Sequence, residues 1–331
     1  MRGFRIVIGA ALVVVALLSS ANATDWVRSG VNTNSGIWGI RRHLLWAIPP
    51  AGFRANEPRG LIRLGYPVLS NGGYALINFI AIEPVVTGEK GYSELERSQL
   101  DRLRGKRIWT EGETNALAPG TLSTIAPGVE QLTVPLRVEA FDNGAHVRLD
   151  VQQRSDRPDE IALTTHREGD SAPLEQCVLT ATMGNMTRTR LLWLKNEVVS
   201  SLKLYSAYRD HGFAPHEFVQ LARLRRTEAG DVMAAVTMNE KDPTATRPVP
   251  QPFWNYTGRK VTQYWRVPAG DVDPGLQLVV NGRYTYWGSR RPIPGGIAFE
   301  NFEIRQPFHD GQRVVFGITS RSPKELGFQA E

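Results

Sequence analysis

Cysteine is almost absent from the chain, and histidine is scarce. Cys177 is the single cysteine, so no disulfide can form within one chain and the fold must depend on its apolar core. Because Cys177 lies in an apolar stretch, we expect a buried small hydrophobe and not a nucleophile. The six histidines are scattered, without the spacing of zinc ligands. The sequence has no phosphate-binding glycine loop and no serine nucleophile elbow. We therefore predict no metal site and no cofactor.

Long apolar runs are missing beyond the N-terminus. Arg2 and Arg5 lead into an apolar run from Ile6 to Leu18, and Ala21-Asn22-Ala23 follows as a small-x-small pattern. This order of features predicts a signal peptide over residues 1–23, cleaved after Ala23. The alternative is an uncleaved anchor, for which the run is short. We expect a periplasmic or secreted protein with no stable membrane span after cleavage.

A concentration of basic residues is also missing. The formal net charge is +6, but lysine and arginine are spread along the chain. Nucleic-acid binding usually gathers these residues on one element, so we predict no nucleic-acid partner. A mildly basic exported protein favours acidic polysaccharides through long-range attraction. The sequence does not indicate an oligomeric state.

Short strand-like segments with turns between them run through most of the chain. The stretch from Tyr74 to Ile82 is nearly continuous in its apolar character, as in a strand buried on both faces. The recurrence of such segments predicts an all-β fold: a large antiparallel β-sandwich, of supersandwich or jelly-roll type, forming a single domain over residues 24–331.

One short surface helix is expected near residues 93–104. Ser93 and Glu96 have the spacing of a capping box, and Gly105 is placed to end a helix. The apolar stripe of this segment is thin, which indicates a helix packed on the sheets.

The stretch Phe299 to Gly317 reads as a β-hairpin with two carboxylates in its first arm. Glu300 and Glu303 are candidates for the acid and base of glycoside cleavage. Their spacing of three puts them on opposite faces of a regular strand, so either a bulge realigns them or only one faces a cleft. We favour Glu303, which has the more polar neighbours. The alternative is that one or both are structural salt-bridge partners.

A second set of polar groups lies in the loop after residue 204. Tyr208, His211 and His216 are of the acid and base types used in β-elimination from uronic acids, and Arg209 is of the type that neutralises the uronate carboxylate. A loop positioned by a rigid sheet is where such groups are usually found. The alternative is a surface loop whose aromatic side chains cap one end of the sandwich.

Aromatic side chains are dense between residues 253 and 287. Sugars stack on aromatic rings while polar neighbours bind the hydroxyl groups, so these residues are candidates for glycan contact; the alternative is that the rings fill the β core. The candidates are Trp254, Tyr256, Trp265, Tyr284, Tyr286, Trp287 and Arg283.

Three stretches carry a resemblance to a known group of proteins. YALINFIAIEP, LTATMGN and FENFEIRQPF with GQRVVFGI resemble exported bacterial β-sandwich proteins of polysaccharide-degrading organisms, and the size is similar to the galactose-mutarotase-like supersandwich. The resemblance implies carbohydrate as the ligand and assigns no catalytic residue.

These observations lead to two expectations of different class. The first is a secreted carbohydrate-active enzyme, either a glycoside hydrolase using Glu303 or Glu300, or a polysaccharide lyase using Tyr208 and His211. The second is a glycan-binding or surface-assembly sandwich without chemistry.

Overall fold

The computed structural model describes residues 24–33, 36–48, 59–110, 117–182, 187–240, 258–287 and 289–329. The predicted signal peptide over residues 1–23 lies outside the described residues, as do the candidate glycan contacts Trp254 and Tyr256. No helix in the described part of the chain is long and apolar enough to span a membrane.

The first of two large sheets has ten antiparallel strands. Nine pair in the order β1-β2-β3-β4-β5-β12-β20-β19-β15, and β6 pairs with β5. Their bounds are β1 Trp26–Val27, β2 Ile37–Ile40, β3 Leu45–Ala47, β4 Leu61–Tyr66, β5 Ala75–Val86, β6 Glu89–Lys90, β12 Gln176–Thr182, β15 Glu217–Gln220, β19 Gln277–Arg283 and β20 Ala298–Arg305.

The second sheet has eleven antiparallel strands. Nine pair in the order β14-β13-β17-β18-β21-β11-β10-β9-β7, while β16 pairs with β17 and β8 with β9. Their bounds are β7 Ile108–Thr110, β8 Thr121–Ala126, β9 Val129–Val138, β10 Val147–Arg154, β11 Arg157–Arg167, β13 Thr189–Trp193, β14 Val198–Ser200, β16 Arg225–Arg226, β17 Val232–Met238, β18 Thr262–Val267 and β21 Gln312–Thr319.

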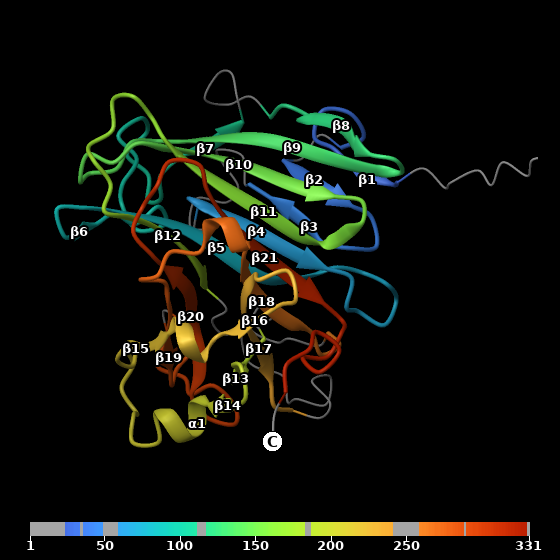
Figure 1. Ribbon diagram of the computed structural model, residues 1–331. Helices are drawn as coiled ribbons and strands as arrows, with labels where there is room; N and C mark the ends of the chain where they lie inside the picture. Colours follow the sequence, from blue (N-terminus) through green and yellow to red (C-terminus); the bar gives the residue numbers. More distant parts are fainter. Residues whose placement is uncertain are drawn as a thin grey trace, which may run out of the picture.

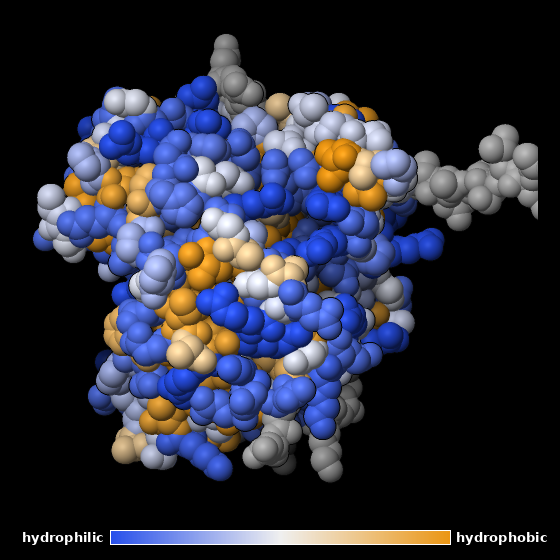
Figure 2. Space-filling model, in the orientation of Figure 1, coloured by the Kyte–Doolittle hydropathy of each residue, from blue (hydrophilic) through white to orange (hydrophobic). Residues whose placement is uncertain are grey.

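The two sheets face each other across an apolar core, which confirms the all-β sandwich. In one part of the molecule β9, β10 and β11 lie over β2 to β5, and in the other β19 and β20 lie beside β17 and β18 (Figure 1). The main core cluster takes alternate residues from strands of both sheets, for example Val147, Leu149 and Val151 of β10. Period-two alternation thus places one face of each strand in the core. On the face drawn in Figure 2 hydrophilic residues predominate and apolar residues form separate areas.

The predicted helix near residues 93–104 is wrong. This segment forms turns and an isolated bridge between Arg97 and Arg104. Ser93 is fully buried, and its hydroxyl donates to Gly60 O at 2.6 Å and accepts from Ile82 N at 2.9 Å. A side chain bonded to two other segments cannot cap a helix, and the thin apolar stripe gives a helix nothing to pack. The four-residue helix α1 lies instead at Ser201–Leu204, with short 3₁₀ turns at Leu221–Arg223 and Ala269–Asp271.

The stretch Phe299 to Gly317 forms two strands but not the predicted hairpin. β20 pairs with β12 and β19 in the first sheet, whereas β21 pairs with β11 and β18 in the second. Each strand presents apolar side chains to the core, and Trp265 of β18 joins them: its ring packs edge-on against Phe316 and its Nε1 donates to Phe302 O at 2.7 Å. The apolar faces of the two strands therefore meet across the core, and their backbones pair in different sheets.

Candidate functional site

A β-bulge in β20 puts Glu300 and Glu303 on the same face of the first sheet. Val280 of β19 pairs with Phe302, but Gly282 pairs with Phe299, so β20 has one extra residue there. Phe299 and Phe302 are both in the core, which leaves Glu300 and Glu303 facing away from it. The bulge is one of the two arrangements expected from the spacing. In a regular strand Phe302 and Glu300 would share a face, whereas the bulge puts them on opposite faces.

Strand register aligns polar groups across the outer face of this sheet. Glu303 of β20 pairs with Thr180 of β12 on one side and with Val279 of β19 on the other, and Val279 pairs with Phe218 of β15. Glu83 of β5 lies one row along, opposite Val178. Residues two apart on a strand share a face, so Glu83 and Glu303 lie on this same outer face.

The hydroxyl of Thr180 lies between two buried carboxyl groups. Its Oγ1 is 2.7 Å from Glu83 Oε2 and 2.5 Å from Glu303 Oε2. All three residues are at most 4% exposed. A hydroxyl has one hydrogen to donate, so if both contacts are hydrogen bonds, one carboxyl group must itself be protonated and donate to Oγ1. Burial raises the pKa of Glu83, and the charge of Glu303 adds to this effect.

Two cations complete what we call the glutamate cluster, which comprises Glu83, Lys90, Thr180, Glu303 and Arg305. Lys90 Nζ forms an ion pair with Glu83 and lies 3.8 Å from Glu303 Oε2. Arg305 Nε donates to Glu303 Oε1 at 2.8 Å. Burial lowers the pKa of Lys90, but the attraction of the two glutamates outweighs burial, so the net shift is upward and the ammonium stays charged. Each cation keeps 22% of its side chain exposed, so they are the part of the cluster that reaches solvent.

Exposed rings surround these two cations. Phe218 is 46% exposed, with the guanidinium of Arg305 5.6 Å from its ring centre, and Tyr92 is 36% exposed, with the ammonium of Lys90 at 5.5 Å. His216 lies beside Phe218, at 6.2 Å between ring centres. Burial lowers the pKa of His216 despite the opposing charge of Glu303, so its imidazole is neutral at pH 7. The cluster thus has a buried floor and an exposed aromatic and cationic rim.

Glu94 extends the set of carboxyl groups. Burial, and after it the charge of Glu83, raises the pKa of Glu94 to about 7. Lys90 and Arg104 oppose this shift, and Glu94 Oε2 is buried without a hydrogen-bond partner among the described residues. Trp287, which was predicted to contact glycan, is 39% exposed with Arg104 5.5 Å from its ring centre.

Of the predicted catalytic residues, the structure brings His216 and Glu303 together and leaves Glu300, Tyr208 and His211 elsewhere. His216 Nε2 lies 3.2 Å from Asn281 Nδ2 in the neighbouring strand. Glu300 is 1% exposed, and in the described part of the chain neither of its carboxyl oxygens has a partner. Burial raises the pKa of Glu300 to about 7, and the charge of Arg283 opposes this.

Arg283 interacts both with Glu300 and with the loop that carries Tyr208 and His211. It is buried, its Nη2 donates to the backbone oxygen of His211 at 2.7 Å, and its guanidinium lies over Phe213. Tyr208 is half-buried. Burial raises the pKa of its hydroxyl, and the charge of Arg283 opposes this rise. No hydrogen bond between described residues joins Tyr208 or His211 to the glutamate cluster.

The predicted aromatic glycan surface is only partly at the surface. Trp265 and Tyr286 are each 1% exposed and cannot stack on a sugar in this structure, because they pack in apolar clusters. Tyr284 is half-buried beneath Arg209, whose Cζ lies 5.2 Å from its ring centre. Arg209 is exposed and donates to its own loop, at Ser206 O and Tyr208 O. For Trp265 and Tyr286 the alternative of core filling is the correct one.

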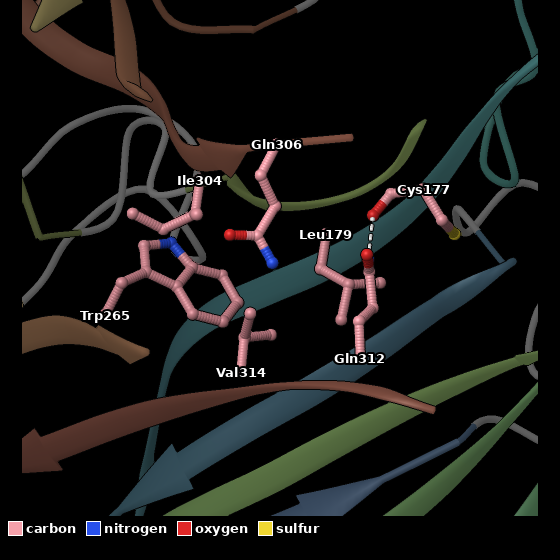
Figure 3. Close-up of a pocket in the computed structure, with 7 residues that line it drawn as sticks. All are labelled: Cys177, Leu179, Trp265, Ile304, Gln306, Gln312 and Val314. Carbon is pink, nitrogen blue, oxygen red and sulfur yellow. Dashed lines mark hydrogen bonds between the residues drawn. The ribbon is translucent and has the colours of Figure 1, made fainter. Parts of the chain in front are cut away.

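A small internal cavity lies beside Trp265, between the two sheets (Figure 3). Its volume is about 10 Å³, room for about one water molecule. Gln312 Nε2 donates across it to the backbone oxygen of Cys177 at 3.1 Å. Cys177 is buried as predicted, and burial raises the pKa of its thiol to about 12. This cavity is too small to be a ligand site.

The sequence did not single out Glu83, Lys90, Thr180, Arg305 and Phe218. Glu83 carries the clearest signal, since it is a carboxylate directly after the long apolar run from Tyr74 to Ile82. Arg305 lies two residues from Glu303 on β20 and so shares its face, whereas the places of Thr180, Lys90 and Phe218 are recognisable only once the strand pairing is known. Among the described residues, no group of three or more His, Cys, Asp or Glu side chains is placed to hold a metal ion.

No family model matches this chain, and neither a curated protein nor a solved structure matches it.

Proposed function

We propose that the chain is an exported carbohydrate-active protein that binds acidic glycans at the rim of the glutamate cluster. The observation that carries the proposal is the pairing of the exposed ring of Phe218 with Arg305, whose guanidinium is held by buried Glu303. A sugar ring stacks its apolar face on an aromatic side chain, and an arginine fixed in place binds a carboxylate in a defined geometry.

The charge of the cluster favours an acidic sugar over a neutral one. Lys90 and Arg305 supply two positive charges, while burial raises the pKa of Glu83 and so favours its neutral form, which leaves positive charge in excess at the rim. A uronate carboxylate at the rim would balance the surplus. Neutral His216 can donate to or accept from a sugar hydroxyl. The positive net charge of the chain and the predicted signal peptide agree with an acidic extracellular ligand.

Calorimetric titration of the purified mature chain with an oligouronate, and with a neutral oligosaccharide of the same length, tests this proposal. We expect the oligouronate to bind more tightly. Phe218→Ala and Arg305→Gln should each weaken that binding about tenfold or more.

Phe213→Ala is the matched control, because Phe213 is as exposed as Phe218 and also lies under an arginine, but away from the cluster. Equal loss in Phe213→Ala and Phe218→Ala, or equal affinity for neutral and acidic sugars, would reject the proposal.

Cleavage of the glycan is a second candidate function, and the meeting of two carboxyl groups at the Thr180 hydroxyl favours it. Two carboxyl groups of which one is protonated and one ionised are the acid and base that glycoside hydrolysis needs. Both are closed over by the rest of the cluster, and a substrate would have to displace Lys90 to reach them. Binding is for this reason the function that the geometry supports best.

Assays with a panel of neutral and acidic polysaccharides, following reducing ends and the ultraviolet absorbance of unsaturated uronates, test for cleavage. Reducing ends that vanish in Glu303→Gln and Glu83→Gln but persist in Glu89→Gln would support hydrolysis at the cluster; Glu89 is exposed and next to Lys90. Growth of absorbance that depends on Tyr208 and His211 would support elimination instead. If neither signal appears with any polymer, binding is the one remaining candidate function.

A further inference from the structure

A hollow of about 190 Å³ lies on the second sheet, and arginines dominate its lining. Arg154 of β10, Arg157 of β11, Arg266 of β18 and Arg313 of β21 surround it, with Glu160 as its one acidic residue. Four positive charges therefore face one negative charge. None of these residues belongs to the glutamate cluster, which is built on the other sheet.

Strand register explains why the surface is hollow there. Gln152, Ala162, Val315 and Arg266 form one row across β10, β11, β21 and β18. Ala162 and Val315 are buried but lie outside the main core cluster, which places them on the outer face. Two small apolar side chains in the middle of the row make a floor, and the longer side chains around them make walls. Because the walls rise from paired strands, the hollow is preformed.

The acidic groups near the hollow already have partners. Arg266 binds Glu160 at 2.5 Å and Asp231 at 2.7 Å, and Arg154 binds Asp156 at 2.7 Å. Among the residues that the structure describes, Arg157 has one ion-pair contact, 3.6 Å to Glu160, and half of its side chain is exposed.

Arg313 is the least compensated of the four. Its Nε is buried and has no hydrogen-bond acceptor among the described residues. The nearby Asp271 accepts from the backbone N of Arg313 at 3.1 Å and lies 3.5 Å from His309. Burial lowers the pKa of Arg313; the charge of Asp271 opposes this, and the other three arginines add to the lowering. A buried guanidinium N–H without an acceptor is a costly arrangement that a bound anion relieves.

We propose that this hollow is a binding site for a compact oxyanion, a sulfate, phosphate or carboxylate group. The oxygens of the anion would accept from Arg313 and Arg157, and the apolar floor of Ala162 and Val315 would support the group that bears the anion. Planar guanidinium groups from separate strands suit oxyanions, which accept several charge-assisted hydrogen bonds at once.

Calorimetric titration at low ionic strength tests the site with four probes: sodium sulfate, sodium phosphate, sodium acetate and glucose 6-phosphate. We expect at least one probe to bind with one site per chain, and its affinity to fall as sodium chloride is added. Arg313→Gln and Arg157→Gln should each weaken binding about tenfold. Arg148→Gln should not, because Arg148 lies on the same face of β10 but outside the hollow.

The probes distinguish the source of the anion. Binding of inorganic sulfate or phosphate identifies a site for the free ion, and binding of glucose 6-phosphate alone identifies a site for an anion carried on a larger molecule. The proposal is overturned if no probe binds, or if Arg148→Gln weakens binding as much as the other variants. Circular dichroism checks folding, and half-exposed Arg157 decides the matter if Arg313→Gln does not fold. These variants leave the Phe218 rim intact, so this site can fail without the proposed function failing.

Discussion

Glu300 is the residue whose surroundings have the plainest physical consequence. Its carboxyl group is 1% exposed, neither oxygen has a partner in the described structure, and burial raises its pKa from 4.5 to about 7. Burying an ionised carboxylate without hydrogen bonds is costly, so the folded state holds the proton more tightly than the unfolded state does.

The free energy of unfolding should therefore depend on pH through Glu300. Between pH 4.5 and about 7 the folded state binds more protons at this residue, so its contribution to stability is present below pH 4.5 and is lost as the pH rises through 7. The loss is on the order of 3 kcal/mol. Urea unfolding at a series of pH values should show it, and Glu300→Gln should remove it.

Glu89→Gln is the control for that experiment, since Glu89 is exposed. Glu83 and Glu94, whose pKa values are also raised, stay in both proteins and cancel in the comparison. A wild type and Glu300→Gln variant with parallel pH profiles would show that Glu300 is solvated or paired in solution.

For single residues, the sequence predicts burial where the neighbours in the chain decide it, and fails where contacts from other strands decide it. Burial of Cys177 follows from its apolar neighbours, and the prediction is confirmed. The polar neighbours of Glu303 favour an accessible face, but the residue is fully buried, because Thr180 and Lys90 from other strands and Arg305 from β20 itself close over it. The contacts with Thr180 and Lys90 depend on the pairing of strands far apart in the chain and leave no local signal.

Among the elements, the segment after residue 90 shows how local and tertiary signals compete. Its serine, glutamate and glycine fit a helix, but the structure uses them in turns that pack against Gly60. Gly60 has φ +74°, and a Cβ placed on it would lie 1.9 Å from Ser93 O. Only glycine allows the two backbones to approach so closely.

Two glycine variants separate this close approach from backbone strain. Gly60 and Gly72 have nearly the same φ, +74° and +76°, but a Cβ on Gly72 would have no atom within 4 Å. Gly72→Ala should cost only the left-handed strain of about 1–2 kcal/mol. Gly60→Ala should cost clearly more, because the backbone at Ser93 must also move. Thermal unfolding measures both, and equal costs would mean that the segment yields freely.

The bulge in β20 could not be decided from the sequence. The spacing of Glu300 and Glu303 is compatible with a bulge or with a regular strand, and the choice depends on Phe299 and Phe302, which both enter the core. Asn281 supports the bulge by accepting from Asn301 N at 3.1 Å. That partner lies on another strand, so the sequence around Glu300 alone cannot reveal it.

For the whole molecule, the strand pattern predicts the fold class and the structure confirms it. Period-two alternation and recurrent turns are local properties, so the sandwich is recognisable from them. Sheet order is not local: β5 pairs with β12, and β12 with β20. The same non-local pairing brings Glu83, Thr180 and Glu303 together, which explains why Glu83 and Thr180 were missed.

A core shared by both sheets should unfold as one unit. The main core cluster contains side chains from nearly every long strand of the two sheets. We expect one cooperative transition in urea, with the same midpoint by far-ultraviolet circular dichroism and by tryptophan fluorescence. Two separated transitions would show that the two ends of the sandwich are independent domains.

The position of the last two strands has a consequence for how the chain is made. β20 lies between β12 and β19, and β21 lies between β18 and β11, so each sheet receives one of its inner strands from the final part of the chain. During synthesis, neither sheet can become continuous until residues 298–319 have emerged. Until then the edges of β12, β19, β18 and β11 that these two strands will cover are open, a state in which chains pair with one another. The nascent protein should therefore depend on holding chaperones until these two strands are free to pair.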